Sequence, residues 1–294
     1  MIIARLYGGL GNQMFQYAAA RRLQLLRGAE LRLDLGWFDT RAARRPSRPY
    51  ALGHLTLDAK PASTADIAAV TTAPARWPTV RLLLDSSRPH GRKRLRCERT
   101  PYRYETDFTD TPDPVYLDGY WQNESYFNAI ADVVRYEFGV KSPVSPASMR
   151  IADTMAGVTA VSVHVRRGDY ARQAHTRQHH GLCPIEYYTA ACSRIETLVR
   201  DPYYFVFSDE PDWARDNLSF IKPVTFVSCN DSDHQYEDLH LMTLCRHHVV
   251  ANSSFSWWGA WLAERPGQVV IAPQPWVAAN LPGDQIIPER WMRC

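Results

Sequence analysis

The chain has 294 residues, and its 34 basic and 31 acidic side chains give a formal net charge of +3, so a nucleic-acid partner is not indicated. With 45% hydrophobic residues it is long enough for two domains of ordinary size, and no apolar run reaches the roughly 18 residues of a membrane span. The six cysteines contain no C-x-x-C pair, so we expect free thiols in a cytoplasmic protein, with no zinc site and no disulfide scaffold.

The first 140 residues alternate strand and helix patterns. Residues 2–7 predict a short strand, a glycine-rich turn follows at 8–11, and residues 12–27 place their apolar side chains on one helix face. Such a turn lets a ligand approach the backbone and directs N–H groups at an anion, although a purely structural turn is the alternative. Strands at 30–34 and 115–119 and a helix at 123–138 are also expected, whereas residues 36–112 give no clear pattern.

A segment with two prolines and two serines, residues 141–146, predicts a boundary between domains 1–140 and 141–294. The second domain again alternates helix and strand, which predicts a parallel sheet with crossover helices. The elements expected there are helices at 147–156, 184–200, 235–246 and from 254, and strands at 158–166, 203–208, 247–251 and 268–272.

Polar side chains follow the strand at 158–166, at the edge of a parallel sheet where ligands bind. Arg166 and Arg167 provide planar donors that match a phosphate or pyrophosphate. Because side chains alternate along a strand, His164 shares a face with Arg166 and Arg167 points to the other face. His164 is therefore expected to contact a nucleotide, with a structural histidine as the alternative, and Arg167 could equally make a structural ion pair.

A second candidate loop, residues 252–254, separates the strand at 247–251 from an apolar helix. Its hydroxyl and amide groups can cap that helix, and the same groups can hold a phosphate at the helix N-terminus. Three tryptophans follow at positions 257, 258 and 261. We expect them mainly to pack in the core rather than to form a sugar platform.

Together these segments resemble the motifs of bacterial α-1,2-fucosyltransferases, in the same order along the chain. The motifs are Gly8-Gly9-Leu10-Gly11-Asn12-Gln13-Met14-Phe15-Gln16, His164-Val165-Arg166-Arg167-Gly168-Asp169-Tyr170, Phe207-Ser208-Asp209-Glu210 and Asn252-Ser253-Ser254-Phe255-Ser256-Trp257-Trp258-Gly259. The resemblance implies a GT-B-like α/β fold of two Rossmann-type domains with a cleft between them. It also implies metal-independent, inverting transfer of L-fucose from GDP-β-L-fucose to the 2-hydroxyl of a β-galactoside on a glycan or lipid-linked acceptor.

The resemblance assigns roles to these residues. Arg166 is expected against the β-phosphate, where it would stabilise the leaving group, with His164 beside it. Asp209 is expected to accept from guanine, the alternative being a cap for the helix that begins near Pro211. The remaining donor-binding residues are expected to be Gly9, Gly11, Asn12, Gln13, Arg167, Ser208, Asn252, Ser253, Ser254 and Phe255.

No residue has a spacing that identifies a catalytic base. Asp169 is the candidate nearest to the phosphate motif, with His175 and Glu186 behind it, and some fucosyltransferases of related fold need no strong base. The D-x-D pattern at 231–233 has the form of a divalent-metal site, but the family implied by the resemblance works without metal, so we expect none. The histidine pairs at 179–180 and 247–248 are not expected to bind metal either.

Other functions stay open at this point. A transferase of the same fold with another nucleotide sugar or linkage is the main alternative, and a non-catalytic glycan-binding module is a remote one. Arginine-rich clusters in the first half could contact an anionic membrane surface from the cytoplasmic side, although a solvated surface is the simpler interpretation. These clusters contain Arg41, Arg44, Arg45 and Arg48, then Arg88, Arg92, Lys93, Arg94, Arg96 and Arg99.

Overall fold

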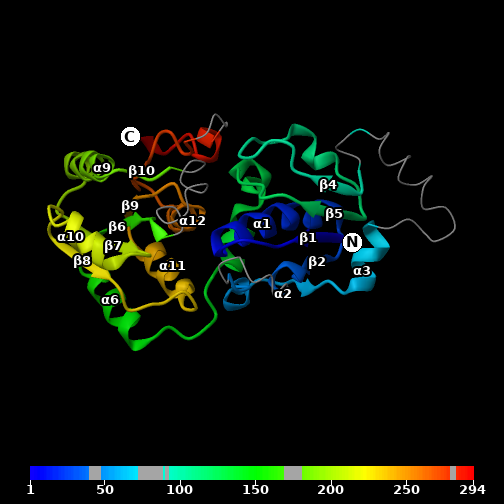
Figure 1. The fold of residues 1–294 in the computed structure, drawn as a ribbon, viewed down its shortest axis with the longest axis horizontal. Helices are drawn as coiled ribbons and strands as arrows, with labels where there is room; N and C mark the ends of the chain where they lie inside the picture. The colour runs from blue at the N-terminus through cyan, green and yellow to red at the C-terminus, as the bar shows by residue number, and fades with distance from the viewer. Residues whose placement is uncertain (40–47, 72–88, 90–92, 169–180, 279–282) are drawn as a thin grey trace. The chain divides into compact units, whose positions relative to one another are not determined.

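The computed structural model describes residues 1–39, 48–71, 89, 93–168, 181–278 and 283–294 (Figure 1). The chain divides into two compact units, Met1–Gly139 and Val140–Cys294. Each unit contains one parallel sheet with helices packed on it, which is the two-sheet α/β architecture expected from the sequence. Within the described ranges, no helix is both long and apolar enough to cross a membrane.

The first unit is built on a five-stranded sheet in the order β3-β2-β1-β5-β4. Its neighbouring strands are all parallel. The strands are β1 (Ile2–Arg5), β2 (Leu31–Asp34), β3 (Lys60–Pro61), β4 (Leu95–Cys97) and β5 (Val115–Asp118), and the longer helices are α1 (Leu10–Arg27), α3 (Thr64–Thr71) and α5 (Ala131–Glu137). Helix α3 packs its Val70 against Ile3 and Tyr116 of the sheet.

Two features of this unit differ from the sequence prediction. The helix expected at 123–138 is divided into 3₁₀ turns at Glu124–Tyr126 and Asn128–Ile130 followed by α5, because Tyr126 and Phe127 are pulled into the core against other aromatic rings. The interval without a clear pattern contains the short strands β3 and β4 and helix α3.

The second unit is built on a six-stranded parallel sheet in the order β11-β10-β9-β6-β7-β8. Its strands are β6 (Thr159–Val165), β7 (Pro202–Ser208), β8 (Val224–Val227), β9 (His247–Val249), β10 (Val270–Ala272) and β11 (Met292–Arg293). Its helices are α6 (Pro146–Ala156), α9 (Ile185–Leu198), α10 (Pro211–Asn217), α11 (Gln235–Leu244) and α12 (Ser254–Leu262).

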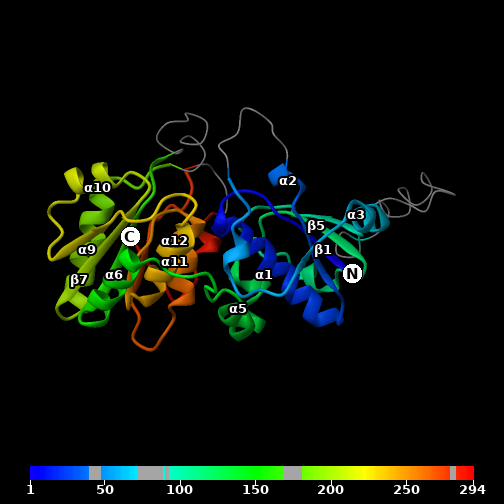
Figure 2. The same ribbon diagram turned by 90° about the horizontal axis from the view of Figure 1, so that it is seen from below.

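Both faces of this sheet are covered, which explains why β6 is buried on both of its faces. Val161, Val163 and Val165 belong to the core that α9 and α10 complete, whereas Ala160 belongs to the core with α6 and α11. His164 therefore lies on the α6 and α11 side of the sheet. Helix α11 lies beside α12 in this unit (Figure 2). The tryptophans of α12 are fully buried, as expected for core packing, and Trp257 donates from its indole nitrogen to the carbonyl of Ile286 at 2.8 Å.

Candidate functional site

Three loops of the second unit meet at one sheet edge, because β9, β6 and β7 are neighbouring parallel strands. They carry Arg166 after β6, Asp209 after β7 and the loop at 252–254 after β9. The structure therefore brings together the motifs that the sequence placed at successive strand ends. The glycine-turn residues belong to the first unit.

Arg166 and Asp209 form an ion pair, with 2.9 Å between the arginine Nη1 and the carboxylate Oδ2. The other carboxylate oxygen of Asp209 accepts the backbone N–H of Arg167 at 2.9 Å. Both side chains of the pair are mostly covered, with 19% and 25% exposure. Asp209 does not cap α10, since the residue at the N-cap is Glu210. In this structure the carboxylate positions the guanidinium at the strand end.

Gly168 allows this arrangement. A Cβ at this position would lie 2.4 Å from the Oδ2 of Asp209, which is closer than side-chain carbons approach. The glycine of the motif is therefore required by the close approach of the Asp209 carboxylate to the backbone, a role that the spacing of the motif did not reveal.

Arg167 points to the opposite side of the sheet and makes structural contacts. Its Nε lies 3.2 Å from a carboxylate oxygen of Glu210, and its guanidinium carbon lies 3.7 Å from the ring centre of Trp213. This is the ion-pair alternative for Arg167, completed by a cation–π contact. The sequence did not indicate the contact between Arg167 and Trp213, because Arg167 follows β6 whereas Trp213 lies on α10, far along the chain. The predicted contact of Arg167 with the donor stays a prediction.

His164 is buried, and burial lowers its pKa to about 4, while Asp209 partly opposes this and Arg166 adds to it. The imidazole is therefore neutral at physiological pH. Its ring centre lies 5.7 Å from that of Phe255, and its Nδ1 has no hydrogen-bond partner among the residues that the structure describes. A buried polar atom without a partner at a ligand edge fits a histidine that hydrogen-bonds a bound molecule.

The loop after β9 caps helix α12 through Ser253, whose hydroxyl accepts the backbone N–H of Phe255 at 3.3 Å. Asn252 is held in place by its amide, which donates to the carbonyl of Gly181 at 3.4 Å. Ser254 is the first residue of the helix. The N-terminus of this nine-residue helix lies at the same edge as Arg166, and both favour an anion. Ser208 ends β7, and its hydroxyl accepts the N–H of Glu210 at 3.0 Å.

The glycine turn of the first unit forms the start of α1. Gly8 has a φ of +81°, and Gly9 is the N-cap residue. Gly11 is buried in the first turn. The amide of Gln13 is fully buried; it donates to the carbonyls of Gly8 and Pro49 at 3.0 Å and accepts the N–H of Ala51 at 2.9 Å.

These contacts give Gln13 a structural role within its own unit, and its predicted contact with a phosphate or sugar stays a prediction. Asn12 is more accessible, and its side-chain oxygen accepts from Gln122 at 2.8 Å.

Asp169 and His175 lie outside the described residues, so the structure gives no geometry for them. Glu186 is exposed on the first turn of α9. Asp231 of the D-x-D pattern accepts the backbone N–H of Asp233 and of His234 and contacts the His234 ring at 2.7 Å, so it organises the turn before α11. Among the residues that the structure describes, no three His, Cys, Asp or Glu side chains come together as a metal site would require.

Comparisons with known proteins identify the family of the chain. The family model described as glycosyl transferase family 11 matches residues 101–292. An Escherichia coli alpha-1,2-colitosyltransferase is 30% identical over 100% of this chain and 98% of its own length, and the Escherichia coli O-antigen biosynthesis glycosyltransferase WbnK is 28% identical over 94% of each. Galactoside alpha-(1,2)-fucosyltransferase 1 of Saimiri boliviensis boliviensis is 26% identical over 87% of this chain and 63% of its own.

A solved structure shares the fold. The GDP complex of a mutant of Arabidopsis thaliana FUT1 superposes with a TM-score of 0.53 at 11% identity, over 94% of this chain and 71% of that one. Together with the two parallel sheets, this confirms a GT-B-like fold of two Rossmann-like domains.

Proposed function

Because the chain belongs to glycosyl transferase family 11, we propose that it transfers L-fucose from GDP-β-L-fucose to the 2-hydroxyl of a terminal β-galactoside, with inversion and without a metal cofactor. The observation that carries this proposal is the guanidinium of Arg166, held by Asp209 at the strand end beside the N-terminus of α12. The named specificities of the relatives support the 2-linkage and the class of sugar.

The chemistry follows from the direction in which charge moves. Breaking the bond between fucose and GDP places growing negative charge on the β-phosphate, so a donor fixed near that oxygen stabilises the transition state more than the bound donor. Arg166 keeps its charge at any working pH, and Asp209 limits its rotation. A neutral His164 and the helix N-terminus would complete the phosphate contacts.

The test compares Arg166→Ala with a matched arginine variant of the same unit, Arg200→Ala, whose side chain is 95% exposed. Initial rates of transfer from GDP-fucose to lactose are measured in EDTA, together with the unfolding temperature of each variant. Loss of one such donor typically lowers kcat by a factor of about 10²–10³. We expect that loss for Arg166→Ala only, with both variants folded; equal rates for the two variants would contradict the proposal.

The donor has a second candidate, because a relative that aligns over the whole chain is named a colitosyltransferase. Colitose is fucose without its 3-hydroxyl. A site that hydrogen-bonds this hydroxyl therefore rejects colitose, whereas a site that is apolar at this position discriminates only weakly between the two sugars. Competition between GDP-fucose and GDP-colitose for lactose in one reaction decides between them. Preferential transfer of colitose would replace fucose in the proposal and leave the phosphate chemistry unchanged.

A further inference from the structure

The carboxyl edge of the sheet in the first unit carries two tyrosines in ring contact that the proposed phosphate chemistry does not use. Tyr7 follows β1 and Tyr120 follows β5, and these two strands are parallel neighbours. Their ring centres are 4.7 Å apart, with the planes inclined by 60°. Tyr120 is 36% exposed, so part of an aromatic surface is presented to solvent at the sheet edge where ligands of such folds bind.

A polar pair lies beside the tyrosines. Arg5 donates to the carboxylate of Asp118 at 2.8 Å, and its guanidinium carbon is 5.4 Å from the ring centre of Tyr7. Both side chains are partly exposed, at 41% and 28%. Because each charge compensates the other, the pair does not favour an anion. It still offers N–H donors and carboxylate acceptors, the groups that hydroxyls require.

The loop that carries Tyr120, residues 119–121, is fixed by contacts with Glu98. Glu98 accepts the backbone N–H of Tyr120 at 2.8 Å and of Trp121 at 3.1 Å. Trp121 is buried and has a φ of +56°, a conformation that a large residue keeps only where its surroundings impose it. A Cβ at Gly119 would lie 2.5 Å from the Cβ of Glu98, so the loop and the glutamate pack without space between them.

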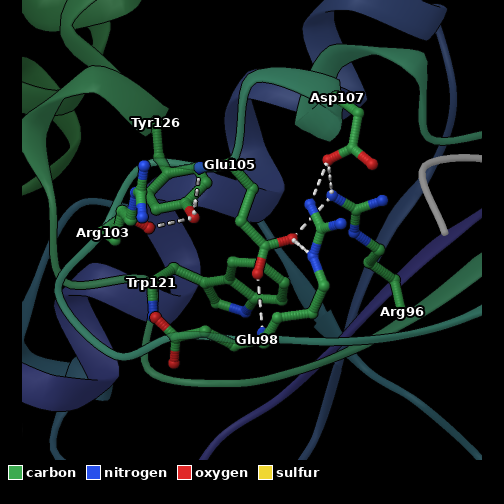
Figure 3. Close-up of polar contacts among 8 residues, drawn as sticks. Arg96, Glu98, Arg103, Glu105, Asp107, Trp121 and Tyr126 are labelled. Atoms are coloured by element: carbon green, nitrogen blue, oxygen red, sulfur yellow. Dashed lines mark hydrogen bonds and ion pairs between the residues drawn. The ribbon is translucent and has the colours of Figure 1, made fainter.

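A buried ionic network fixes the segment that follows Glu98 (Figure 3). Arg96 is fully buried and lies 2.8 Å from a carboxylate oxygen of Glu105 and 2.6 Å from one of Asp107. The backbone N–H of Glu105 donates to the hydroxyl of Tyr126, whose ring contacts that of Trp121. A loop fixed in this way is preorganised, which lowers the entropy lost when a ligand binds.

We propose that Tyr7, Tyr120, Arg5 and Asp118 form a subsite for a neutral pyranose, with the tyrosine rings against the C–H face of the sugar and the ion pair hydrogen-bonded to its hydroxyls. Sites that combine an aromatic surface with a few fixed polar groups suit such a ligand. Identifying this sugar as the galactoside acceptor rests on the function proposed above; the subsite itself rests only on the first unit.

The test measures sugar binding by the full chain with saturation-transfer NMR and calorimetry. The probes are methyl β-D-galactopyranoside, lactose, N-acetyllactosamine and methyl β-D-glucopyranoside, each with and without GDP. Tyr120→Ala keeps the backbone N–H that Glu98 holds, and Tyr136→Ala is the matched control, because Tyr136 is 74% exposed on α5 of the same unit. Asp118→Asn is a second variant that retains the shape of the side chain.

We expect Tyr120→Ala and Asp118→Asn to raise the sugar Kd at least tenfold, whereas Tyr136→Ala keeps the wild-type sugar Kd. The rate of GDP-fucose hydrolysis in the absence of acceptor is expected to be the same in all these variants as in the wild type. An unchanged sugar Kd in both variants, or no binding of any probe by the wild type, would overturn the subsite. Sugar binding that depends on Tyr120 without fucose transfer would refute the proposed function alone.

Discussion

Gly168→Ala isolates the contact that positions Arg166. The added methyl would lie 2.4 Å from the Oδ2 of Asp209, and an ordinary contact begins at 3.4 Å, so the carboxylate must move by about 1 Å. Such a shift breaks the 2.9 Å contacts of Asp209 with the Arg166 guanidinium and with the Arg167 N–H. The variant changes neither charged residue.

The expected loss can be worked out from these contacts. A hydrogen bond to a charged group contributes about 1.5–3 kcal/mol, and the pair is partly exposed, so we expect a loss of about 2 kcal/mol of unfolding free energy. For a unit of this size that corresponds to a fall of about 4–8 °C in Tm. Since the guanidinium of Arg166 then loses its contact with Asp209, we also expect kcat for transfer to fall by a factor of about ten or more.

The matched control is Gly157→Ala in the same unit. Gly157 ends α6 with a φ of −90°, and a Cβ there would lie 3.7 Å from the carbonyl of Thr154, an ordinary contact. Thermal unfolding and initial rates are measured for both variants. If Gly168→Ala has the same Tm and the same initial rate of transfer as the wild type and Gly157→Ala, Asp209 does not hold Arg166 as described.

Three further predictions concern the second unit. Arg166→Lys keeps the charge but loses the planar fork, so we expect kcat to fall by a factor of about 10–100 with little change in Tm; wild-type kinetics would contradict the phosphate role. Ser253→Ala removes the cap of α12 and should cost about 1 kcal/mol in urea unfolding, an effect that is absent if the cap contributes nothing. Burial lowers the pKa of His248 to about 3, so the folded imidazole stays neutral while the unfolded one is protonated below about 6.5, and stability is lost as the pH falls. His248→Asn should therefore reduce the loss of unfolding free energy between pH 6 and 4.5 by about 1.4 kcal/mol per pH unit, and equal slopes for variant and wild type would refute this.

The sequence predicts the second unit well, because its signals are local. Strand β6 is buried on both faces, as its short apolar run predicts for a covered parallel strand, and Arg166 and Arg167 follow at its end. Ser253, one of three predicted caps, is the residue that caps α12. Because β6, β7 and β9 run in the same direction, the loops that follow them share one edge of the sheet.

What the sequence did not provide is pairing between distant positions. The motifs predict a ligand contact for Arg166 and for Asp209 separately, and nothing local shows that these two side chains, 43 positions apart, also meet each other. The run of basic residues predicts a surface position for Arg96, but this side chain is fully buried because Glu105 and Asp107 neutralise it. Tertiary aromatic contacts likewise divided the helix expected at 123–138.

The measurement that tests the central claim most directly is the linkage of the product formed from GDP-[¹³C]fucose and lactose in EDTA, determined by NMR. The account predicts a single product in which fucose is α-linked to the galactose 2-hydroxyl and whose formation is lost in Arg166→Ala. A product linked elsewhere on the acceptor, or a product formed equally well by Arg166→Ala, would contradict it.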